Sequence, residues 1–554
     1  MPTPDGIDGA ATSGGGILNL IEKIGNRLPD PATLFLIGTV LVILASWIIS
    51  SMGVTVVEKL PQPVTETVTD ASGAIVERPV LDESGAQVIE WVATGNEYTA
   101  TSLLTRDGIF WMIESMVDNF VGFAPLGVVL VGMLGIGICE RTGFIGAILK
   151  TLMLVVPGHL LTPTMVFLGI MSSMTLDAGY VVLPPLAAAL YKAVGRSPLA
   201  GLAAVFAGVA AGFNANLFIT GLDPMLAGFA NIGARVIEPD YLVNPACNLW
   251  FMMASTVVMT LTGWAVTSFF VERRLHAKAP EDGGPVLATA EDLATHRLTP
   301  EESSSMVRSL GVMVGVLAVI LALILIPGAP LYTYEEEPGF DRWVTAIVPL
   351  LFFIFIIPGI AYGIFMGKLK SDKDVARLLI ESMAGMAPII VLAFFAAQFI
   401  EYFGHSGLDR MLALSGGLAL GQANMPPWLL IVLFIGVTMV FNLFIGSMSA
   451  KYAMFAPIFI PMFMMVGISP ELTQAAYRIG DSVTNIITPL NPYLIIILVF
   501  MQKYVPRGGM GTLVSTMLPY TIVFAVVWTI MIVIWMALGI PLGPGGGLTF
   551  TPGG

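Results

Sequence analysis

Residues 442–492 place charged side chains inside a part of the chain that is otherwise apolar enough for a membrane. Lys451, Arg478 and Asp481 lie here among Ser, Thr, Asn and Pro residues, with long apolar segments on both sides. A charged side chain at membrane depth costs about 2.5–3.5 kcal/mol on insertion scales. A chain that places several of them beside helix-breaking prolines is expected to build a polar site within the bilayer.

The second half of this stretch predicts a helix that starts at Ser469-Pro470-Glu471, which supplies a capping Ser, a Pro at the first helical position and an acid facing the helix dipole. Polar side chains then recur every three or four residues and so share one stripe of the helix. The stripe consists of Gln474, Arg478, Asp481, Asn485 and Thr488. In a membrane it must face protein or a water-filled cavity. Pro489 and Pro492 remove backbone donors and predict a break in the helix.

The same pattern occurs twice in the chain. Three motifs of the first half recur in the same order in the second half. The matched pairs are Ser173-Met174-Thr175 with Ser447-Met448-Ser449, Gly195-Arg196-Ser197-Pro198 with Gly467-Ile468-Ser469-Pro470, and Ile219-Thr220-Gly221-Leu222-Asp223-Pro224 with Ile487-Thr488-Pro489-Leu490-Asn491-Pro492. Apolar segments interrupted by Gly and Pro at corresponding positions of two halves point to the binding site of a transporter.

Composition predicts an all-α polytopic membrane protein, because 56% of the 554 residues are hydrophobic and only 11% are charged. Hydropathy and loop charge predict about nine transmembrane helices plus two re-entrant hairpins, arranged as inverted repeats. Lys23 and Arg27 precede the first span and an acidic segment follows it, which places the N-terminus in the cytoplasm. The expected segments are an N-terminal cytoplasmic piece (1–30), the first helix (31–52), a β-rich extracytoplasmic insert (53–105), the first transmembrane half (106–271), a cytoplasmic loop (272–305), the second half (306–540) and a tail (541–554).

Several classes of function fit the sequence poorly. The net charge of −13 resides mostly in loops and does not indicate a nucleic-acid partner. The four His and two Cys residues are scattered, so no enzyme site is indicated and no cofactor is expected. An ion channel would tolerate re-entrant hairpins, but no symmetric filter motif recurs. A secondary transporter explains the repeat, the breaks and the buried charges together; without a Walker-type loop its energy is expected to come from a Na⁺ or H⁺ gradient.

Long motifs carry a family resemblance over nearly the whole chain: NLFIGSMSAK, SPELTQAAYRIGDSVTNIITPLNPY, DAGYVVL, SPLAGLAAVFAGV and Asp223-Pro224-Met225-Leu226-Ala227-Gly228. They resemble the AbgT family of p-aminobenzoyl-glutamate transporters, some of which resemble sulfonamide (antimetabolite) efflux pumps. The resemblance implies a bowl-shaped homodimer in the bacterial inner membrane, with nine spans and two hairpins per protomer. It implies functional roles for Asp223, Asn442, Ser449, Pro470, Arg478, Asp481 and Pro489. This chain departs from the family at Tyr452, where the family usually has Trp.

p-Aminobenzoyl-glutamate is an aromatic amide with two carboxylates. A binding site for it requires cationic or dipolar donors for the carboxylates and an aromatic or apolar wall for the ring. Arg478 offers a planar fork for a carboxylate and Lys451 a point charge. Two alternatives stay open: Arg478 and Asp481 neutralise each other at i,i+3, and Lys451 extends to an interface. The residues expected to contact substrate are Asp223, Asn442, Ser449, Lys451, Tyr452, Pro470, Arg478, Asp481, Asn485, Pro489 and Asn491.

Oxygen-bearing side chains near the hairpin tips and the breaks are candidates for Na⁺, which as a hard cation prefers oxygen ligands. Asp223 is the strongest of them, although it could instead cap the helix that continues after Pro224. The tip hydroxyls could instead form interhelical hydrogen bonds. The candidates are Ser172, Ser173, Thr175, Asn214, Asn216, Asp223, Asn442, Ser447, Ser449, Asp481 and Thr488. Sodium-coupled import and proton-coupled export both fit this architecture.

Overall fold

The computed structural model describes residues 31–551, apart from residues 64, 70–74, 80–88, 156, 176–177, 287–298, 335–341 and 489–490. The predicted N-terminal segment (1–30) and Pro489 therefore lie outside the described residues. Within the described part the protein is mostly helical.

Four β-strands follow the first helix, α2 (Pro31–Ser51). β1 (Thr55–Pro63) pairs antiparallel with β4 (Ile89–Thr99), and β2 (Thr65–Thr69) pairs antiparallel with β3 (Ile75–Pro79). The prediction of a β-rich insert is confirmed, and the chain is mostly rather than entirely helical. Glu58 of β1 forms an ion pair of 3.1 Å with Arg410 of α19 (Leu408–Gln422), which joins the strands to the helical part.

Helices make up the rest of the described chain. Those of the first half are α3 (Arg106–Glu114), α4 (Met116–Val121), α5 (Ala124–Thr142), α6 (Phe144–Val155), η1 (Gly158–Leu160), α7 (Leu161–Met171), η2 (Ser172–Thr175), α8 (Ala178–Ala193), α9 (Pro198–Phe206), η3 (Ala207–Ala211), α10 (Leu222–Ala234), α11 (Leu249–Val266), η4 (Thr267–Val271), α12 (Glu272–His276) and η5 (Pro280–Asp282). Those of the second half, besides α19, are α14 (Pro300–Leu325), α15 (Arg342–Thr345), α16 (Ile347–Phe365), α17 (Asp372–Gly385), α18 (Ala387–His405), α20 (Pro427–Asn442), α21 (Met448–Met464), α22 (Pro470–Val483), α23 (Pro492–Gln502) and α24 (Met510–Leu538).

Six helices of the described part are long and apolar enough to cross a membrane: α2, α11 with its continuation, α14, α16, α18 and α24. Shorter apolar helices stand where the hairpins are predicted. The 11 residues of α7 extend about 17 Å at a rise of 1.5 Å per residue, which is less than the roughly 30 Å of a hydrocarbon core. The total of nine spans and two hairpins stays a prediction.

Each half contains an interrupted helix. α9 continues through the π-helical turn η3 and ends before Gly212, and α10 begins ten residues later. α22 begins as predicted, with Pro470 in its first turn and the Ser469 side chain accepting a hydrogen bond from Leu472 N. It ends at Val483, and α23 begins at Pro492.

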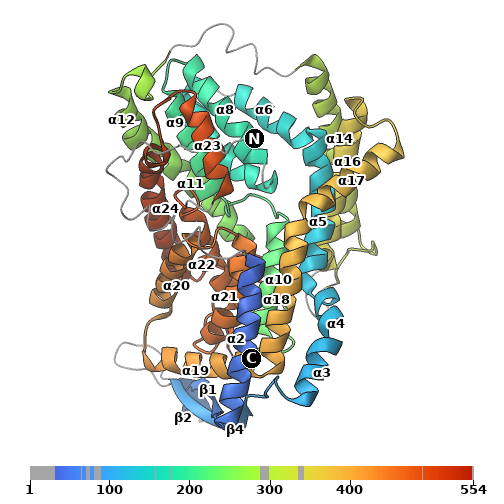
Figure 1. The fold of residues 1–554 in the computed structure, drawn as a ribbon, viewed down its shortest axis with the longest axis vertical. Helices are drawn as coiled ribbons and strands as arrows, with labels where there is room; N and C mark the ends of the chain where they lie inside the picture. The colour runs from blue at the N-terminus through green and yellow to red at the C-terminus, as the bar shows by residue number, and fades with distance from the viewer. Residues whose placement is uncertain are drawn as a thin grey trace, which may run out of the picture.

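The loops that connect each helix pair to its interrupted helix contact different parts of the chain. Ser197, between α8 and α9, donates a hydrogen bond to Gly283 O at 2.5 Å. Ser469, between α21 and α22, donates to Gly547 O at 2.7 Å. Figure 1 shows α8, α9 and α12 at one end of the molecule, and α19 with the β-strands at the opposite end.

Small residues let α7 and the α9–η3 segment approach closely. All residues of α9 and η3 are buried. A Cβ atom added to Gly208 would lie 2.3 Å from Val166 O and 2.9 Å from the Cα of Gly169. Glycine is therefore required at this contact, as expected where helices pack through small residues.

Candidate functional site

The part of the predicted polar stripe that lies in α22 (Gln474, Arg478 and Asp481) is enclosed by protein, whereas Asn485 and Thr488 lie beyond the end of this helix at Val483. Every residue of α22 is buried, and the helix contacts α10, α20, α21 and α24. The hydrogen bonds and ion pairs of the stripe are therefore made with residues of neighbouring helices. These partners determine which charged side chains are neutralised.

Arg478 pairs with a carboxylate from the other half of the chain. Its Nη2 lies 2.5 Å from Asp223 Oδ1. The other carboxylate oxygen of Asp223 accepts hydrogen bonds from the backbone N of Thr220 at 2.6 Å and from its hydroxyl at 2.8 Å. Gly221 occupies the N-cap position of α10, so Asp223 lies in the first turn and is not the cap. A negative charge is favoured there by the helix dipole.

Lys451 forms the second buried ion pair. Its Nζ lies 2.7 Å from Asp481 Oδ1, and both side chains are almost fully buried, with 0% and 1% exposed. The ammonium group also donates to Asn442 Oδ1 and, at 3.3 Å, to Ile445 O. The alternative in which Lys451 extends to an interface is wrong. Among the residues of this site that the structure describes, the ion pairs are Arg478–Asp223 and Lys451–Asp481, in place of an Arg478–Asp481 pair.

Three asparagines form hydrogen bonds around the second break, and one of them, Asn214, joins it to the first break. Asn214, from the break of the first half, donates to Asp481 Oδ2 at 3.2 Å and to the Ser482 hydroxyl at 2.8 Å. Asn442, at the end of α20, donates to Asp481 O at 2.6 Å and to Asn485 Oδ1 at 2.9 Å. Asn491 caps α23 and donates to Asn485 O at 2.9 Å.

The hydroxyl candidates for a cation fall into two groups. One lies at the first pair of short helices, where Ser173 donates to Ile170 O at 2.7 Å and to Asn216 Oδ1 at 3.1 Å. The neighbouring Ser172 hydroxyl donates to Gly169 O at 2.7 Å. Thr175 lies in η2, and its side chain is outside the description.

The second group lies at the start of α21 and at the second break. The Ser447 side chain caps α21 by accepting from Ala450 N, and it lies 3.4 Å from the Ser449 hydroxyl. Thr488 donates to Leu443 O at 3.3 Å. The role of either group as Na⁺ ligands stays a prediction.

A cavity of about 240 Å³ lies where the two halves meet. It is lined by the tips of both short helix pairs and by the break of the first half, and α5, α17 and α18 complete its wall. The lining residues are Met133, Ile136, Ser173, Phe213, Thr220, Gly221, Leu222, Met225, Gly385, Met386, Ile389, Met448 and Ser449. Thr220 connects this cavity to the Asp223–Arg478 pair through its hydrogen bonds to Asp223.

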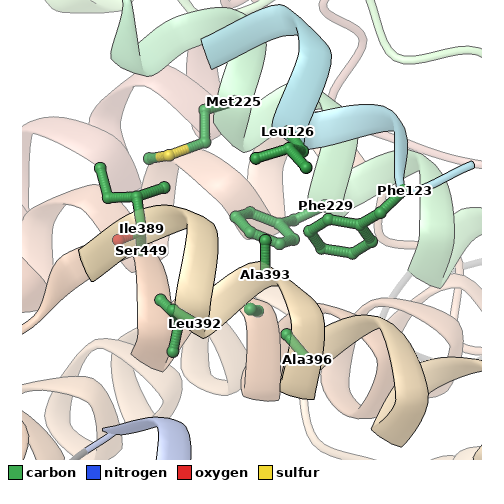
Figure 2. A pocket seen from close by; sticks show the side chains of 10 residues that line it. Phe123, Leu126, Met225, Phe229, Ile389, Leu392, Ala393, Ala396 and Ser449 are labelled. Atoms are coloured by element: carbon green, nitrogen blue, oxygen red, sulfur yellow. The ribbon is translucent and has the colours of Figure 1, made fainter. Parts of the chain in front are cut away.

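An apolar pocket adjoins the cavity and shares Met225, Ile389 and Ser449 with it. Figure 2 shows the rings of Phe123 and Phe229 side by side in this pocket, and their centroids are 5.8 Å apart. Apolar side chains of α18 form the facing wall. Together they form one candidate site, in which the cavity is the polar end and the apolar pocket is the aromatic end.

Tyr452 contacts this region through the pocket wall. The residue is fully buried. Its ring lies 4.4 Å from the ring of Tyr477 and meets Phe229 edge-on at 6.3 Å. The position at which the chain departs from the resembled family is thus packed against an aromatic residue that lines the pocket.

Some residues of the site were missed by sequence reasoning. Phe123 and Phe229 carried no signal, because apolar residues are common throughout the chain. Thr220 and Ser482 could have been found, since each is a polar residue beside a candidate: Thr220 belongs to the repeated motif, and Ser482 follows Asp481. Pro470 acts in the structure as the first residue of α22.

The chain is similar to known proteins over nearly its whole length. Residues 16–550 match the family model described as the AbgT putative transporter family. The chain is 31% identical over 545 residues to the p-aminobenzoyl-glutamate transport protein of Escherichia coli (strain K12), with 97% of both chains covered.

Two solved structures are similar over nearly all of the chain. The Alcanivorax borkumensis YdaH transporter is 37% identical with a TM-score of 0.80, covering 93% of this chain and 100% of that one. MtrF of Neisseria gonorrhoeae, described as illuminating a class of antimetabolite efflux pumps, is 38% identical with a TM-score of 0.82, covering 96% and 100%. The chain therefore belongs to the AbgT transporter family: it is a multi-pass membrane transporter and not an enzyme.

Proposed function

We propose that this protein is an ion-coupled secondary transporter of p-aminobenzoyl-glutamate or a related aromatic carboxylate, acting as a homodimer in the bacterial inner membrane with its N-terminus in the cytoplasm. The observation that carries the proposal is the cavity at the meeting point of both halves, with its polar end and its aromatic end. The similarity to a relative named for p-aminobenzoyl-glutamate transport supports the choice of substrate.

The two ends of the cavity suit the two ends of such a substrate. The aromatic ring packs against Phe123 and Phe229, since aromatic pairs gain about 0.5–1.5 kcal/mol beyond their burial. The carboxylates lie toward Ser449, where α21 begins. A helix N-terminus favours anions through its free N–H groups and its dipole.

The ion pairs supply a reason for coupling. Both basic residues of the site, Arg478 and Lys451, already have carboxylate partners. A substrate carboxylate that pairs with Arg478 displaces Asp223 and leaves it without its counter-charge. An unpaired buried charge costs several kcal/mol. A cation bound at Asp223, either Na⁺ or H⁺, offsets that cost. Substrate anion and coupling ion therefore bind together.

The matched motifs suit alternating access by inverted repeats. The connecting loops of the two short helix pairs contact different parts of the chain, at residues 283 and 547. The two interrupted helices meet through Asn214 and Ser482, beside the buried charges. This arrangement supports nine spans, two re-entrant hairpins and a binding site near the middle of the bilayer.

A second candidate is proton-driven efflux of sulfonamide-type antimetabolites. The similarity to MtrF favours it. An ion channel has less support, because the charged stripe of α22 is buried and ion-paired.

The test is flux in proteoliposomes under imposed Na⁺ or H⁺ gradients. We expect gradient-dependent movement of labelled p-aminobenzoyl-glutamate, and weaker movement of an analogue that lacks the glutamate carboxylates. A labelled sulfonamide is measured in parallel, and its preferential export would favour the second candidate. If no gradient drives either compound, the proposed function is wrong.

A further inference from the structure

α22 carries one more buried acid, which neither ion pair uses. Glu471 lies in the first turn of α22 and is 1% exposed. Within the described residues no Lys, Arg or His lies within ion-pair distance of its carboxylate. Asp223 and Asp481, the other two acids of this core, each have a cationic partner.

The partners of Glu471 are neutral. The hydroxyl of Tyr241 donates toward both carboxylate oxygens at 3.1 Å. Asn248 donates to the backbone O of Glu471 at 2.9 Å and accepts from the Gln474 side chain at 3.1 Å.

The titratable groups around Glu471 do not neutralise it. Those that face it are Tyr241, Cys247 ahead of α11 and Tyr452 of α21. Arg478 lies two helical turns further along α22. Arg478 is held by Asp223. The packed helices α20 and α24 and the C-terminal residues 541–551 contain no Asp, Glu, Lys, Arg or His.

This environment favours a carboxyl group that can gain and lose a proton. An ionised carboxylate that is removed from water without a cation is strongly disfavoured, and a neutral acid avoids that cost. The N-terminal end of a helix acts in the opposite direction, because its dipole stabilises the ionised form. Because the two effects oppose each other, a change in solvent access shifts the balance between the two protonation states.

The C-terminal segment covers this part of α22. Ser469 donates from its backbone N to Leu548 O at 3.3 Å and from its hydroxyl to Gly547 O at 2.7 Å. Phe550 N donates to Gly467 O at 2.9 Å, and the Phe550 ring meets the Tyr241 ring edge-on at 5.7 Å. Phe550 thus packs against Tyr241, the hydrogen-bond donor to Glu471, and residues 547–550 are bonded to the residues that precede α22.

Polar atoms lead from Glu471 toward the ion pairs. Gln474 lies one turn along α22, and Arg478 lies one turn further. Gln474 Oε1, Arg478 Nε and the Tyr452 hydroxyl are buried and have no hydrogen-bond partner within the described residues. Buried polar atoms of this kind are costly to leave unpaired, and ordered water molecules commonly satisfy them. They offer a route for protons between Glu471 and the Arg478–Asp223 pair.

We propose that Glu471 is a proton-exchanging group of this transporter, which takes up and releases a proton beneath the C-terminal segment through Tyr241. Its part in coupling rests on the proposed function, whereas its protonation can be measured without transport. The proton is bound to and lost from one carboxylate oxygen, and no other bond changes.

Infrared difference spectroscopy of the purified protein across a pH jump tests protonation directly. The wild type should show a change in the carbonyl band of a protonated carboxyl group, and Glu471→Gln should lack it. Tyr241→Phe removes the hydrogen-bond donor and should shift the band. Glu381→Gln is the control, because that carboxylate is 47% exposed and paired with Arg141; the band change should persist. If the wild type and Glu471→Gln give the same carboxyl signal, or if Tyr241→Phe leaves the band unmoved, the inference is wrong.

Flux under a pH gradient separates this inference from the proposed function. Glu471→Gln should reduce the gradient-driven flux to its value without a gradient, while Glu381→Gln keeps the wild-type response. An unchanged response in Glu471→Gln would overturn the coupling role. If the wild type shows no flux under any gradient, the proposed function fails, and the infrared result still decides whether Glu471 exchanges a proton.

Discussion

Replacing Asp223 by Asn removes the carboxylate that compensates Arg478 within the described structure. The pair is short, at 2.5 Å between Nη2 and Oδ1, and the side chains are 2% and 11% exposed. Removing one partner of a buried ion pair leaves an uncompensated charge and costs about 3–5 kcal/mol. Asp223→Asn should therefore lower the free energy of unfolding by about that amount, although the hydrogen bonds from Thr220 can partly survive.

A double-mutant cycle measures the interaction free energy between Arg478 and Asp223. Arg478→Met alone leaves the Asp223 charge unpaired and should cost a similar amount. The double variant has no unpaired charge, so its loss of stability should be smaller than the sum of the two single losses, with a coupling of about 0.5–3 kcal/mol. Reversible unfolding in mixed detergent micelles provides the free energies.

The surface pair Arg141–Glu381 serves as the control, with side chains 36% and 47% exposed at a distance of 3.3 Å. Glu381→Gln should cost no more than about 1 kcal/mol, because exposed ion pairs contribute little. If Asp223→Asn costs as little as this control, or if the two single effects are additive, then Arg478 and Asp223 are not the compensating partners that the structure shows.

Three further predictions concern other parts of the molecule. Lys451→Met leaves Asp481 unpaired at 1% exposure and should lower the free energy of unfolding by about 3–5 kcal/mol; Lys451→Met with Asp481→Asn should recover part of this in the same detergent assay. Phe229→Ala removes one ring of the pocket and should weaken binding of p-aminobenzoyl-glutamate more than binding of free glutamate in a scintillation proximity assay; equal weakening would contradict the aromatic contact. Burial raises the pKa of Asp409 in α19 from 3.8 to about 6, so the folded state holds this proton more tightly than the unfolded state, and stability falls as pH rises through this interval. Asp409→Asn should therefore increase the melting temperature above pH 6 and leave it unchanged below the unfolded pKa; the same increase at every pH would contradict this origin.

Features encoded in contiguous residues could be predicted from the sequence. The start of α22 at Pro470 follows from a capping Ser and a Pro in the first turn, and the break before α23 follows from residues that cannot continue a helix. The burial of the polar stripe follows from the cost of exposing charge to lipid. These signals are local, so they can be recognised in the sequence without knowledge of the tertiary structure.

The ion-pair partners of the buried charged side chains could not be predicted from the sequence. Arg478 has Asp481 three residues away, yet it pairs with Asp223, 255 residues away in the sequence. Which acid it meets depends on how α22 is rotated against α10 and α21, and no local pattern specifies that rotation. The aromatic pocket was hidden for a related reason, since Phe123 and Phe229 resemble any other apolar residue in a membrane helix.

The two matched halves differ where the charge is placed. Asp223 and Asn491 occupy equivalent positions of the repeated motif. Asn491 bonds locally to Asn485 O and Tyr493 N, whereas Asp223 receives Arg478 from the other half. A repeat can keep one sequence motif in both halves while the two copies differ in where the helix begins, and while one half supplies the acid and the other the base. Because that ion pair joins the halves, any motion that separates them must first compensate both charges, and a substrate carboxylate together with a cation can do so. Under the proposed function, this ion pair holds the empty transporter in one state, and binding of both substrate and coupling ion is needed to leave that state.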